Sequence, residues 1–397
     1  MNSARLAGRL VAVQLLSTAF ALVAVALSPV RWLRRAGGRR GLSLWTGTPI
    51  LTLPLKAKAE RILGANARSL AVRTYYITQE FDYNLSRWRS LPLVGAFAHF
   101  LAFVWAAVRA DRIHCFCDGA LLPVPRPLGF NFIELWVYRL LGIQVFLWTY
   151  GADVRSRDTT RALGEPNCCT DCTLVGKACI CGEAQRRAKL ARLAANATAV
   201  FSMGDMTEYT PGSRNDLYFW PVDVAGNPGG RYTPVYPEFD RARPVRVVHA
   251  PNHRMFKGTR FLERAVEELR REGVGLELVI VERLPNSEAL TVFRTADVIF
   301  DQCLVGFHGY FALEGMALGK PVMCFIRKRD YLLAPDECPI VNTHPSTLKE
   351  DLRRLVNAPE QLAELGRRGR AYVEKYFSVE AFAQRLAGAY RELGIEP

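Results

Sequence analysis

The sequence predicts an α/β protein of two doubly wound domains, preceded by a hydrophobic helix. Short β-branched runs alternate with helical stretches in the C-terminal half, and a less regular alternation runs through the N-terminal half. An uncharged apolar segment over residues 10–30 predicts the leading helix. A chain of 397 residues is long enough for two such domains, each with its own core.

The strands and helices can be placed by residue range. In the C-terminal half, strands are predicted over 245–251, 276–282, 297–302 and 321–326, and helices over 259–273, from 287, and over 310–318. In the N-terminal half, strands are predicted over 71–78, 112–119, 143–151 and 197–204, and helices over 97–110 and 133–142. Glycine and proline predict a linker over 223–244. The predicted organisation is therefore a leading helix (1–40), an N-terminal domain (41–222), the linker, a C-terminal domain (245–376) and a terminal helix (377–397).

The positive charge of the chain is concentrated at its start. The formal net charge is +14, and the first forty residues contain seven arginines and no acidic residue. This pattern favours an anionic membrane surface as partner. It argues against nucleic acid, because no basic stripe interleaved with aromatic residues follows.

The apolar segment 10–30 has three interpretations. It is long enough for a membrane-anchoring helix. Ala24 and Ala26 would suit cleavage of a signal peptide, and a helix packed on the globular body has the same composition. We prefer the anchor. Five arginines follow the segment and two precede it, so the body is expected on the cytoplasmic side of the membrane.

Charged residues follow the strands of the C-terminal domain. Arg254 and Lys257 follow the first strand, and Gly258 opens a helix there, an arrangement that suits a phosphate or diphosphate. The alternative is that both are solvated loop charges. Glu282 follows the second strand, and Asp301 ends the third.

The helix after the third strand begins near Gly309 and carries Glu314. A carboxylate in the first turns of such a helix can accept hydrogen bonds from the vicinal hydroxyls of a ribose. The alternative is an ordinary surface charge. Cations for phosphate and a carboxylate for hydroxyls, at one edge of one sheet, predict a site for a nucleoside diphosphate, as in a nucleotide sugar.

These residues resemble a known family. "FKGT", "ADVIFD" and "GFHGYFALEGMALGKPV" are similar, over about residues 245–326, to the donor domain of GT-B glycosyltransferases, and most of all to the retaining group called family 4. The resemblance implies two Rossmann-like domains facing a cleft. It also implies that Lys257 and a nearby arginine neutralise the leaving diphosphate, that Glu314 holds the ribose, and that catalysis needs no metal.

The chain departs from the family pattern at two positions. Gly306 stands where the family has a second glutamate that contacts the transferred sugar, and Asn252 stands where it has a phosphate-binding arginine. Arg254 is the candidate substitute for that arginine. In the N-terminal half, "YGADVR" (150–155) resembles a family loop facing the acceptor. Asp153 in that loop is a candidate to orient an acceptor hydroxyl, with a helix-capping aspartate as the alternative. "GTP" (47–49) is a candidate turn for a sugar or phosphate, with a plain turn as the alternative.

Five of the ten cysteines cluster in "CCTDCTLVGKACIC", at positions 168, 169, 172, 179 and 181. Cys169, Cys172, Cys179 and Cys181 could supply four thiolates to a structural zinc ion. Free or redox-active thiols and local disulfides are the alternatives.

The sequence thus predicts a membrane-associated glycosyltransferase that moves a sugar from a nucleotide sugar to a lipid-linked or cell-surface glycan acceptor. One alternative is an inactive scaffold, or nucleotide-binding protein, on the same fold within a polysaccharide assembly complex. Another is a sugar-nucleotide epimerase.

Overall fold

The computed structural model describes residues 3–38, 41–124, 129–170, 172, 183–225, 230–238 and 243–396. Contacts between residues divide the chain into two compact units. Unit 1 comprises Met1–Ser156, Gly182–Leu217 and Arg385–Pro397, and unit 2 comprises Arg157–Cys181 and Tyr218–Gln384.

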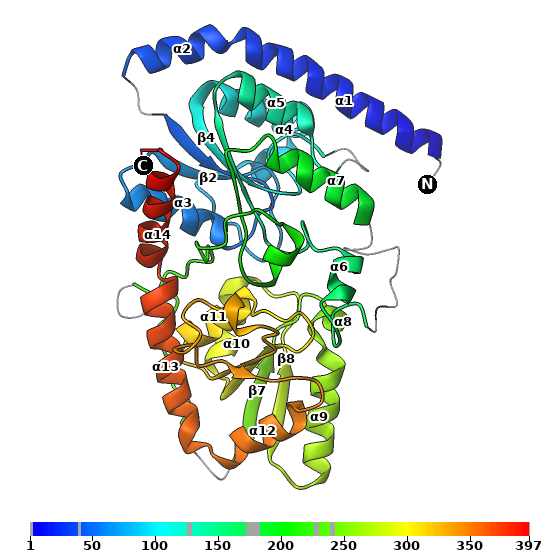
Figure 1. Ribbon diagram of the computed structural model, residues 1–397, viewed down its shortest axis with the longest axis vertical. Helices are drawn as coiled ribbons and strands as arrows, with labels where there is room; N and C mark the ends of the chain where they lie inside the picture. Colours follow the sequence, from blue (N-terminus) through cyan, green and yellow to red (C-terminus); the bar gives the residue numbers. More distant parts are fainter. Residues whose placement is uncertain are drawn as a thin grey trace. The chain divides into compact units, whose positions relative to one another are not determined.

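Unit 1 is built on a parallel sheet with the strand order β3-β2-β1-β4-β5-β6. Figure 1 labels two of these strands, β2 and β4. The strands are β1 (Leu42–Trp45), β2 (Ala67–Ala71), β3 (Tyr83–Asn84), β4 (Ala110–Phe116), β5 (Gln144–Trp148) and β6 (Ala199–Phe201). Its helices are α1 (Ser3–Ala26), α2 (Ser28–Ala36), α3 (Thr52–Ile62), α4 (Pro92–Arg109), α5 (Phe132–Leu140) and α7 (Glu183–Ala194), with short 3-10 turns η1 (Leu85–Ser90) and η2 (Gly204–Tyr209). The last residues of α14 (Val379–Glu392) also belong to this unit.

A buried carboxylate ties β1 to the helices of unit 1. Glu60 on α3 accepts hydrogen bonds from the Ser43 hydroxyl at 2.5 Å, from Trp45 Nε1 at 2.7 Å and from the Tyr390 hydroxyl on α14 at 2.9 Å. Trp45 also stacks on His114 of β4, with 3.9 Å between ring centroids. Polar side chains therefore fix the central strand, in addition to the packing of apolar ones.

Unit 2 contains a second parallel sheet with the order β11-β10-β9-β7-β8. Its strands are β7 (Val245–His249), β8 (Leu276–Ile280), β9 (Val298–Gln302), β10 (Val322–Cys324) and β11 (Val341–Asn342). Its helices are α6 (Arg157–Ala162), α8 (Arg254–Lys257), α9 (Thr259–Arg271), α10 (Asn286–Arg294), α11 (Tyr310–Ala317), α12 (Leu348–Asn357), α13 (Glu360–Phe377) and the first part of α14, with the 3-10 turn η3 (Arg329–Tyr331).

Helices cover both faces of the unit 2 sheet. Val298 and Phe300 on β9 belong to one apolar cluster with residues of α9 and α12. Ile299, the residue between them, faces the other side of the sheet, because side chains alternate along a strand. Its side chain packs on α11, where a Cβ on Gly315 would lie 3.0 Å from it. The unit is doubly wound, as predicted.

Two differences from the predicted elements concern unit 1. The strand expected over 71–78 ends at Ala71, and the residues after it form turns in which Tyr75 and Tyr76 are exposed. Aromatic and β-branched residues suggested a strand there, but no neighbouring layer covers them. Conversely, β1 was not predicted at all, although it lies inside the sheet between β2 and β4.

The N-terminal apolar segment forms α1 and α2. Among the described residues, one stretch, Leu10–Ala36, is long and apolar enough to cross a membrane, judged by length and composition alone. One face of α1 packs on unit 1, with Ser17, Ala21 and Ala24 buried. Packing of this helix on the globular body, one of the three interpretations above, is therefore what the structure shows for these residues.

Candidate functional site

The centre of the candidate site in unit 2 is an ion pair at the carboxyl end of β9. Lys257 Nζ lies 2.7 Å from Asp301 Oδ1, and the Asp301 side chain has no exposed surface. The other carboxylate oxygen accepts a hydrogen bond from the backbone N–H of Gly309, the N-cap residue of α11. The structure thus brings together two predicted site residues, Lys257 and Gly309, through an aspartate between them.

The pKa of Asp301 is held below its ordinary value. Burial alone would raise it, but the Lys257 ammonium, the hydrogen bond that it donates and the Gly309 N–H more than offset burial. Asp301 is therefore a carboxylate, and it holds Lys257 at the edge of the sheet.

The turn that carries Lys257 requires glycine at position 258. Gly258 has a φ of +78°, and a Cβ there would lie 2.5 Å from Cys303 Sγ. His249, at the end of β7, secures the same turn, since its ring nitrogens lie 2.8 Å from Phe300 O and 2.8 Å from Thr259 Oγ1. Burial lowers the pKa of His249 to about 4, so it is a neutral structural residue.

Arg254 and Glu282, both predicted site residues, bind each other. Nε and Nη2 of Arg254 lie 2.9 and 2.8 Å from the two carboxylate oxygens of Glu282, and Nη1 lies 3.2 Å from Glu263. Half of the Arg254 side chain is exposed. The structure gives this arginine carboxylate partners, and a phosphate would have to compete with them.

The Glu314 side chain on α11 is buried and is held by two residues that we did not predict. The Tyr232 hydroxyl and Asn286 Nδ2 donate to Oε1 at 2.9 and 2.8 Å. Burial raises the pKa of Glu314 to about 7, although both hydrogen bonds act to lower it. Glu314 is therefore no ordinary surface charge.

The Glu314–Asn286 pair has acceptor atoms to spare. Asn286 Oδ1 is buried and accepts no hydrogen bond from the described residues. Across the same part of the chain, Glu314 makes its hydrogen bonds to Tyr232 and Asn286 through Oε1 and none through Oε2. A ligand with two neighbouring hydroxyl donors would suit this pair.

The glycine at position 306 has a structural reason. Gly306 has a φ of +93°, and a Cβ there would lie 3.0 Å from Cβ and Nε of Arg327. The Arg327 guanidinium is anchored to the backbone carbonyls of Leu163, Gly164 and Pro166. A glutamate cannot occupy position 306 without strain, because an arginine fills the adjacent space.

The second predicted site lies at the carboxyl edge of the unit 1 sheet. Both carboxylate oxygens of Asp153 are bonded to the backbone: Oδ1 accepts from the N–H groups of Tyr150 and Gly151, and Oδ2 accepts from Cys117 N–H at 3.3 Å. Burial and the nearby Asp118 raise the pKa of Asp153 to about 6. In the structure the Asp153 carboxylate stabilises its own loop through these backbone hydrogen bonds.

Asp118 is the carboxylate that remains available at this edge. Its Oδ2 accepts from the Thr48 and Tyr150 hydroxyls at 2.9 and 2.6 Å, while its Oδ1 is buried and accepts no hydrogen bond from the described residues. The predicted turn at 47–49 approaches closely, since a Cβ on Gly47 would lie 2.7 Å from Gly119 O. An Asp-Gly pair directly after a strand was the sequence signal for this residue, and we did not use it.

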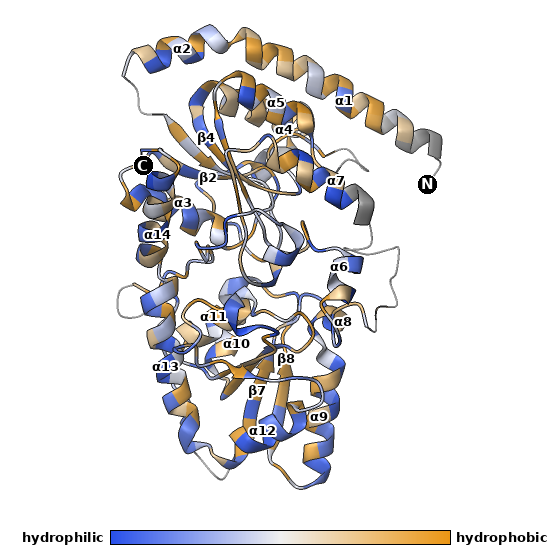
Figure 2. Ribbon diagram, in the orientation of Figure 1, coloured by the Kyte–Doolittle hydropathy of each residue, from blue (hydrophilic) through white to orange (hydrophobic). Residues whose placement is uncertain are grey.

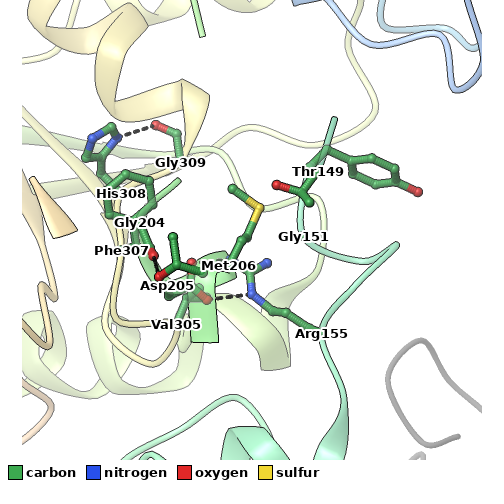
Figure 3. Close-up of polar contacts among 12 residues, drawn as sticks. Thr149, Gly151, Arg155, Gly204, Asp205, Met206, Val305, Phe307, His308 and Gly309 are labelled. Carbon is green, nitrogen blue, oxygen red and sulfur yellow. Dashed lines mark hydrogen bonds and ion pairs between the residues drawn. The ribbon is translucent and has the colours of Figure 1, made fainter. Parts of the chain in front are cut away.

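Arg155, the last residue of "YGADVR", has a structural role. Its Nε and Nη2 each lie 2.7 Å from an Asp205 oxygen, and both side chains are buried (Figure 3). A Cβ on Gly151 would lie 2.2 Å from Arg155 Nη1, so the loop needs glycine to accommodate this pair.

A buried lysine lies behind the same edge. Lys56 Nζ lies 5.2 Å from the ring centroids of Phe116 and Trp148 and 5.9 Å from that of Trp45. Burial lowers the pKa of Lys56 to about 7, although Asp153 acts to raise it.

Replacing Lys56 with methionine is expected to raise the unfolding free energy by about 1–2 kcal/mol at pH 6, because a buried charge is exchanged for an apolar chain of similar length. The gain should shrink as the pH rises from 7 to 10, since folded Lys56 then loses its proton before the unfolded chain does. Denaturant unfolding at pH 6 and pH 9 measures both effects. A variant less stable than the parent at pH 6 would contradict the assigned cost of burial.

The cysteine cluster is described only in part. Cys168 belongs to the apolar core of unit 2, and Cys169 packs against it. This differs from the sequence-based organisation, in which the cluster lay in the N-terminal domain. Cys172 is half-buried, and Cys179 and Cys181 lie outside the described residues, so the zinc prediction stays untested. No group of three or more potential metal ligands occurs within the part of the chain that the structure describes.

Comparisons with known proteins support the fold. Sucrose-phosphate synthase from Thermosynechococcus elongatus matches with a TM-score of 0.56 and 15% identity, over 90% of this chain and 99% of that chain. HepE from Anabaena in complex with UDP and glucose matches with a TM-score of 0.54 and 12% identity, over 89% of this chain and 100% of that chain. HepE in complex with UDP-glucose matches with a TM-score of 0.52 and 14% identity, over 88% of this chain and 99% of that chain.

No protein-family model and no curated protein sequence matches the chain. The structural likenesses show that it has the GT-B fold, as the sequence predicted.

Proposed function

We propose that this protein is a membrane-associated glycosyltransferase that transfers a sugar from a nucleotide sugar to a lipid-linked or cell-surface glycan acceptor, on the cytoplasmic side of the membrane. The observation that carries the proposal is the pair of sites in unit 2: Lys257 held by Asp301, and Glu314 held by Asn286. The first supplies a cation for a diphosphate, and the second supplies acceptors for ribose hydroxyls.

The two sites are joined by α11. Gly309, whose N–H binds Asp301, begins this helix, and Glu314 lies five residues further on. A diphosphate at Lys257 and a ribose at Glu314 would therefore lie near the start and the middle of the same helix. UDP, present in the HepE structure with a similar fold, contains both groups.

The chemistry proposed is transfer of the sugar with departure of the nucleoside diphosphate. The leaving group gains negative charge as the glycosidic bond breaks, and Lys257 is placed to stabilise it. Asp118, with its spare oxygen, is the unit 1 group we propose for the acceptor hydroxyl, in place of Asp153. Retention of the anomeric configuration follows from the resemblance to family 4 and remains part of the proposal.

The membrane and the acceptor class form the second part of the proposal. Seven arginines and no acidic residue in the first forty positions, together with the apolar α1, support attachment to an anionic bilayer. A protein held at the bilayer surface meets lipid-linked acceptors there, which is why we favour them.

The second candidate function is a nucleotide-binding scaffold without catalysis. The conformation of Gly306 favours it, because Arg327 fills the space beside the position where the family has a sugar-contacting glutamate. A scaffold on this fold would keep the sites at Lys257 and Glu314 and lose turnover.

Melting temperature in the presence of UDP, GDP, ADP and dTDP tests nucleotide binding. One of them is expected to stabilise the protein, by about 2.7 kcal/mol at a concentration 100 times its Kd. The corresponding nucleotide sugars, incubated with the protein and a membrane lipid extract, then separate the two candidates. Release of nucleoside diphosphate supports the enzyme, and binding without release supports the scaffold. A protein that none of the four nucleotides stabilises would contradict both.

A further inference from the structure

Exposed apolar side chains are concentrated on one part of the molecule. Of the 19 large hydrophobic residues that are exposed in the described chain, only Val235 lies in unit 2. Most of the others lie on α1 or on elements next to it. We call these residues the α1 surface: Val11, Leu15, Leu16, Leu22 and Val23 on α1, Val30, Trp32 and Leu33 on α2, Leu101 on α4, and Trp136 and Leu140 on α5. Large exposed apolar surfaces mark interaction sites.

The opposite face of α1 is fixed to unit 1 from Ser17 to the end of the helix. Ser17 Oγ accepts a hydrogen bond from Asn131 Nδ2 at 2.9 Å, and both residues are buried. Phe20 stacks on Phe100 of α4, with 5.0 Å between ring centroids. Figure 1 shows α1 running across α4 and α5, and Figure 2 shows it predominantly hydrophobic.

A third attachment lies on α2. Arg31 is buried, and its Nη2 lies 2.8 Å from Asp111 Oδ1, while its Nε donates to Leu141 O. From Ser17 to Arg31 the helical chain is thus held at three points over roughly 20 Å.

These attachments are incompatible with a helix that crosses the bilayer. Ser17 lies near the middle of the apolar segment, so a spanning α1 would place it and Asn131 in the hydrocarbon core. Asn131 caps α5, whose first turn carries the buried carboxyl of Glu134. A spanning α1 would therefore either break the Ser17–Asn131 hydrogen bond or draw these buried polar groups into hydrocarbon, and both changes are costly.

We propose that α1 and α2 lie in the plane of the membrane interface, with the α1 surface immersed in an anionic leaflet, and that the chain does not cross the bilayer. The geometry is that of an apolar helix lying in the interface: one face of α1 packs on unit 1, the other face is exposed, and side chains of α2, α4 and α5 extend the exposed face. Trp32 and Trp136, two of the three exposed tryptophans of the described chain, belong to the α1 surface, and tryptophan concentrates at membrane interfaces. Arg34 on α2 adds positive charge beside them, while Arg35 lies 2.9 Å from Asp111 in an ion pair.

This inference rests on the membrane attachment proposed above and specifies its form. Full-length protein is mixed with phosphatidylglycerol–phosphatidylcholine vesicles and floated on a density gradient, without any donor. The double variants Leu15→Ser/Leu22→Ser and Trp32→Ser/Leu33→Ser are expected to lose at least tenfold in vesicle binding with unchanged melting temperature, whereas Val235→Ser keeps full binding. If neither double variant weakens vesicle binding, the α1 surface is not the part of the protein that binds the membrane.

Topology is tested with a protease-cleavable tag before Met1, in sealed inverted membrane vesicles from a bacterial host. Cleavage of the tag without detergent is expected, because both ends of α1 face the same side as the body. A tag protected until detergent is added means that α1 spans the bilayer, which overturns the inference but leaves attachment intact. Absence of the protein from membranes refutes attachment itself. A dimer seen by light scattering without lipid, and lost in the two double variants, would assign the α1 surface to a second copy.

Discussion

Replacing Lys257 with alanine is expected to weaken binding of the nucleoside diphosphate by about 1.5–3 kcal/mol, roughly 10- to 150-fold in Kd. The ammonium is the cation that Asp301 holds at the carboxyl edge of the unit 2 sheet, where a diphosphate would lie. Titration calorimetry with the nucleotide that gives the largest thermal shift measures the change.

The same substitution is expected to destabilise the ligand-free protein. Asp301 has no exposed side-chain surface, and removing Lys257 leaves its charge buried without a cation. Breaking a buried ion pair in this way costs about 3–5 kcal/mol. A solvated loop charge, the alternative raised in the sequence analysis, would change the melting temperature little when removed, so this measurement also distinguishes the two interpretations of Lys257.

A matched double variant separates binding from stability. Lys257→Ala/Asp301→Asn removes both charges, so most of the lost stability should return while nucleotide affinity stays low. Arg254→Ala is the surface control, because Arg254 is half-exposed and should change the melting temperature little. Affinity that returns fully with stability in the double variant would show that Lys257 does not contact phosphate.

Replacing Glu314 with glutamine is expected to lower affinity for the nucleoside diphosphate about tenfold, or roughly 1.4 kcal/mol. The size of the side chain is kept, but the hydrogen bonds from ribose hydroxyls lose the assistance of the charge. A 2′,3′-dideoxy nucleotide is the control, since it offers Glu314 no hydroxyl and should bind wild type and variant alike. Equal losses for both nucleotides would assign Glu314 a purely structural role.

Without ligand, the stability of the wild type is expected to depend on pH in a way that the stability of Glu314→Gln does not. Burial raises the pKa of Glu314 from 4.5 to about 7, so the folded state binds more protons than the unfolded state between these values. The unfolding free energy of the wild type should therefore fall, relative to the variant, as the pH rises from about 4.5 to about 7, by up to about 3 kcal/mol. Denaturant unfolding at pH 5 and pH 8 measures the difference, which should be constant above pH 7.5.

The sequence was most informative for unit 2, where strands are apolar runs bounded by glycine, proline or charged residues. The predicted range 297–302 and the observed β9, Val298–Gln302, agree to within one residue. β1 was not predicted because it is only four residues long. Its position in the sheet is stabilised by hydrogen bonds from Ser43 and Trp45 to Glu60 on α3. Such long-range hydrogen bonds leave no local pattern.

Prediction of the candidate site in unit 2 was limited in the same way, because contacts between residues distant in sequence leave no local pattern. Lys257 and Glu314 could be selected because residue type and spacing after a strand carry chemical meaning. Tyr232 and Asn286 could not, since each lies far from Glu314 in sequence and only the fold brings their polar atoms to it. Asp153 was selected from its loop, whereas the oxygen that remains available at that edge belongs to Asp118, 35 residues earlier.

The most direct test of the proposed function is transfer of a radiolabelled sugar. Purified full-length protein is incubated with the nucleotide sugar whose diphosphate gives the largest thermal shift, together with a membrane lipid extract, and label is counted in the organic phase. We expect lipid-bound label that requires both the protein and the extract, and that falls at least tenfold in Lys257→Ala/Asp301→Asn. Tight nucleotide binding without any label transferred, across the whole donor panel, would contradict the assignment of a glycosyltransferase and leave the scaffold.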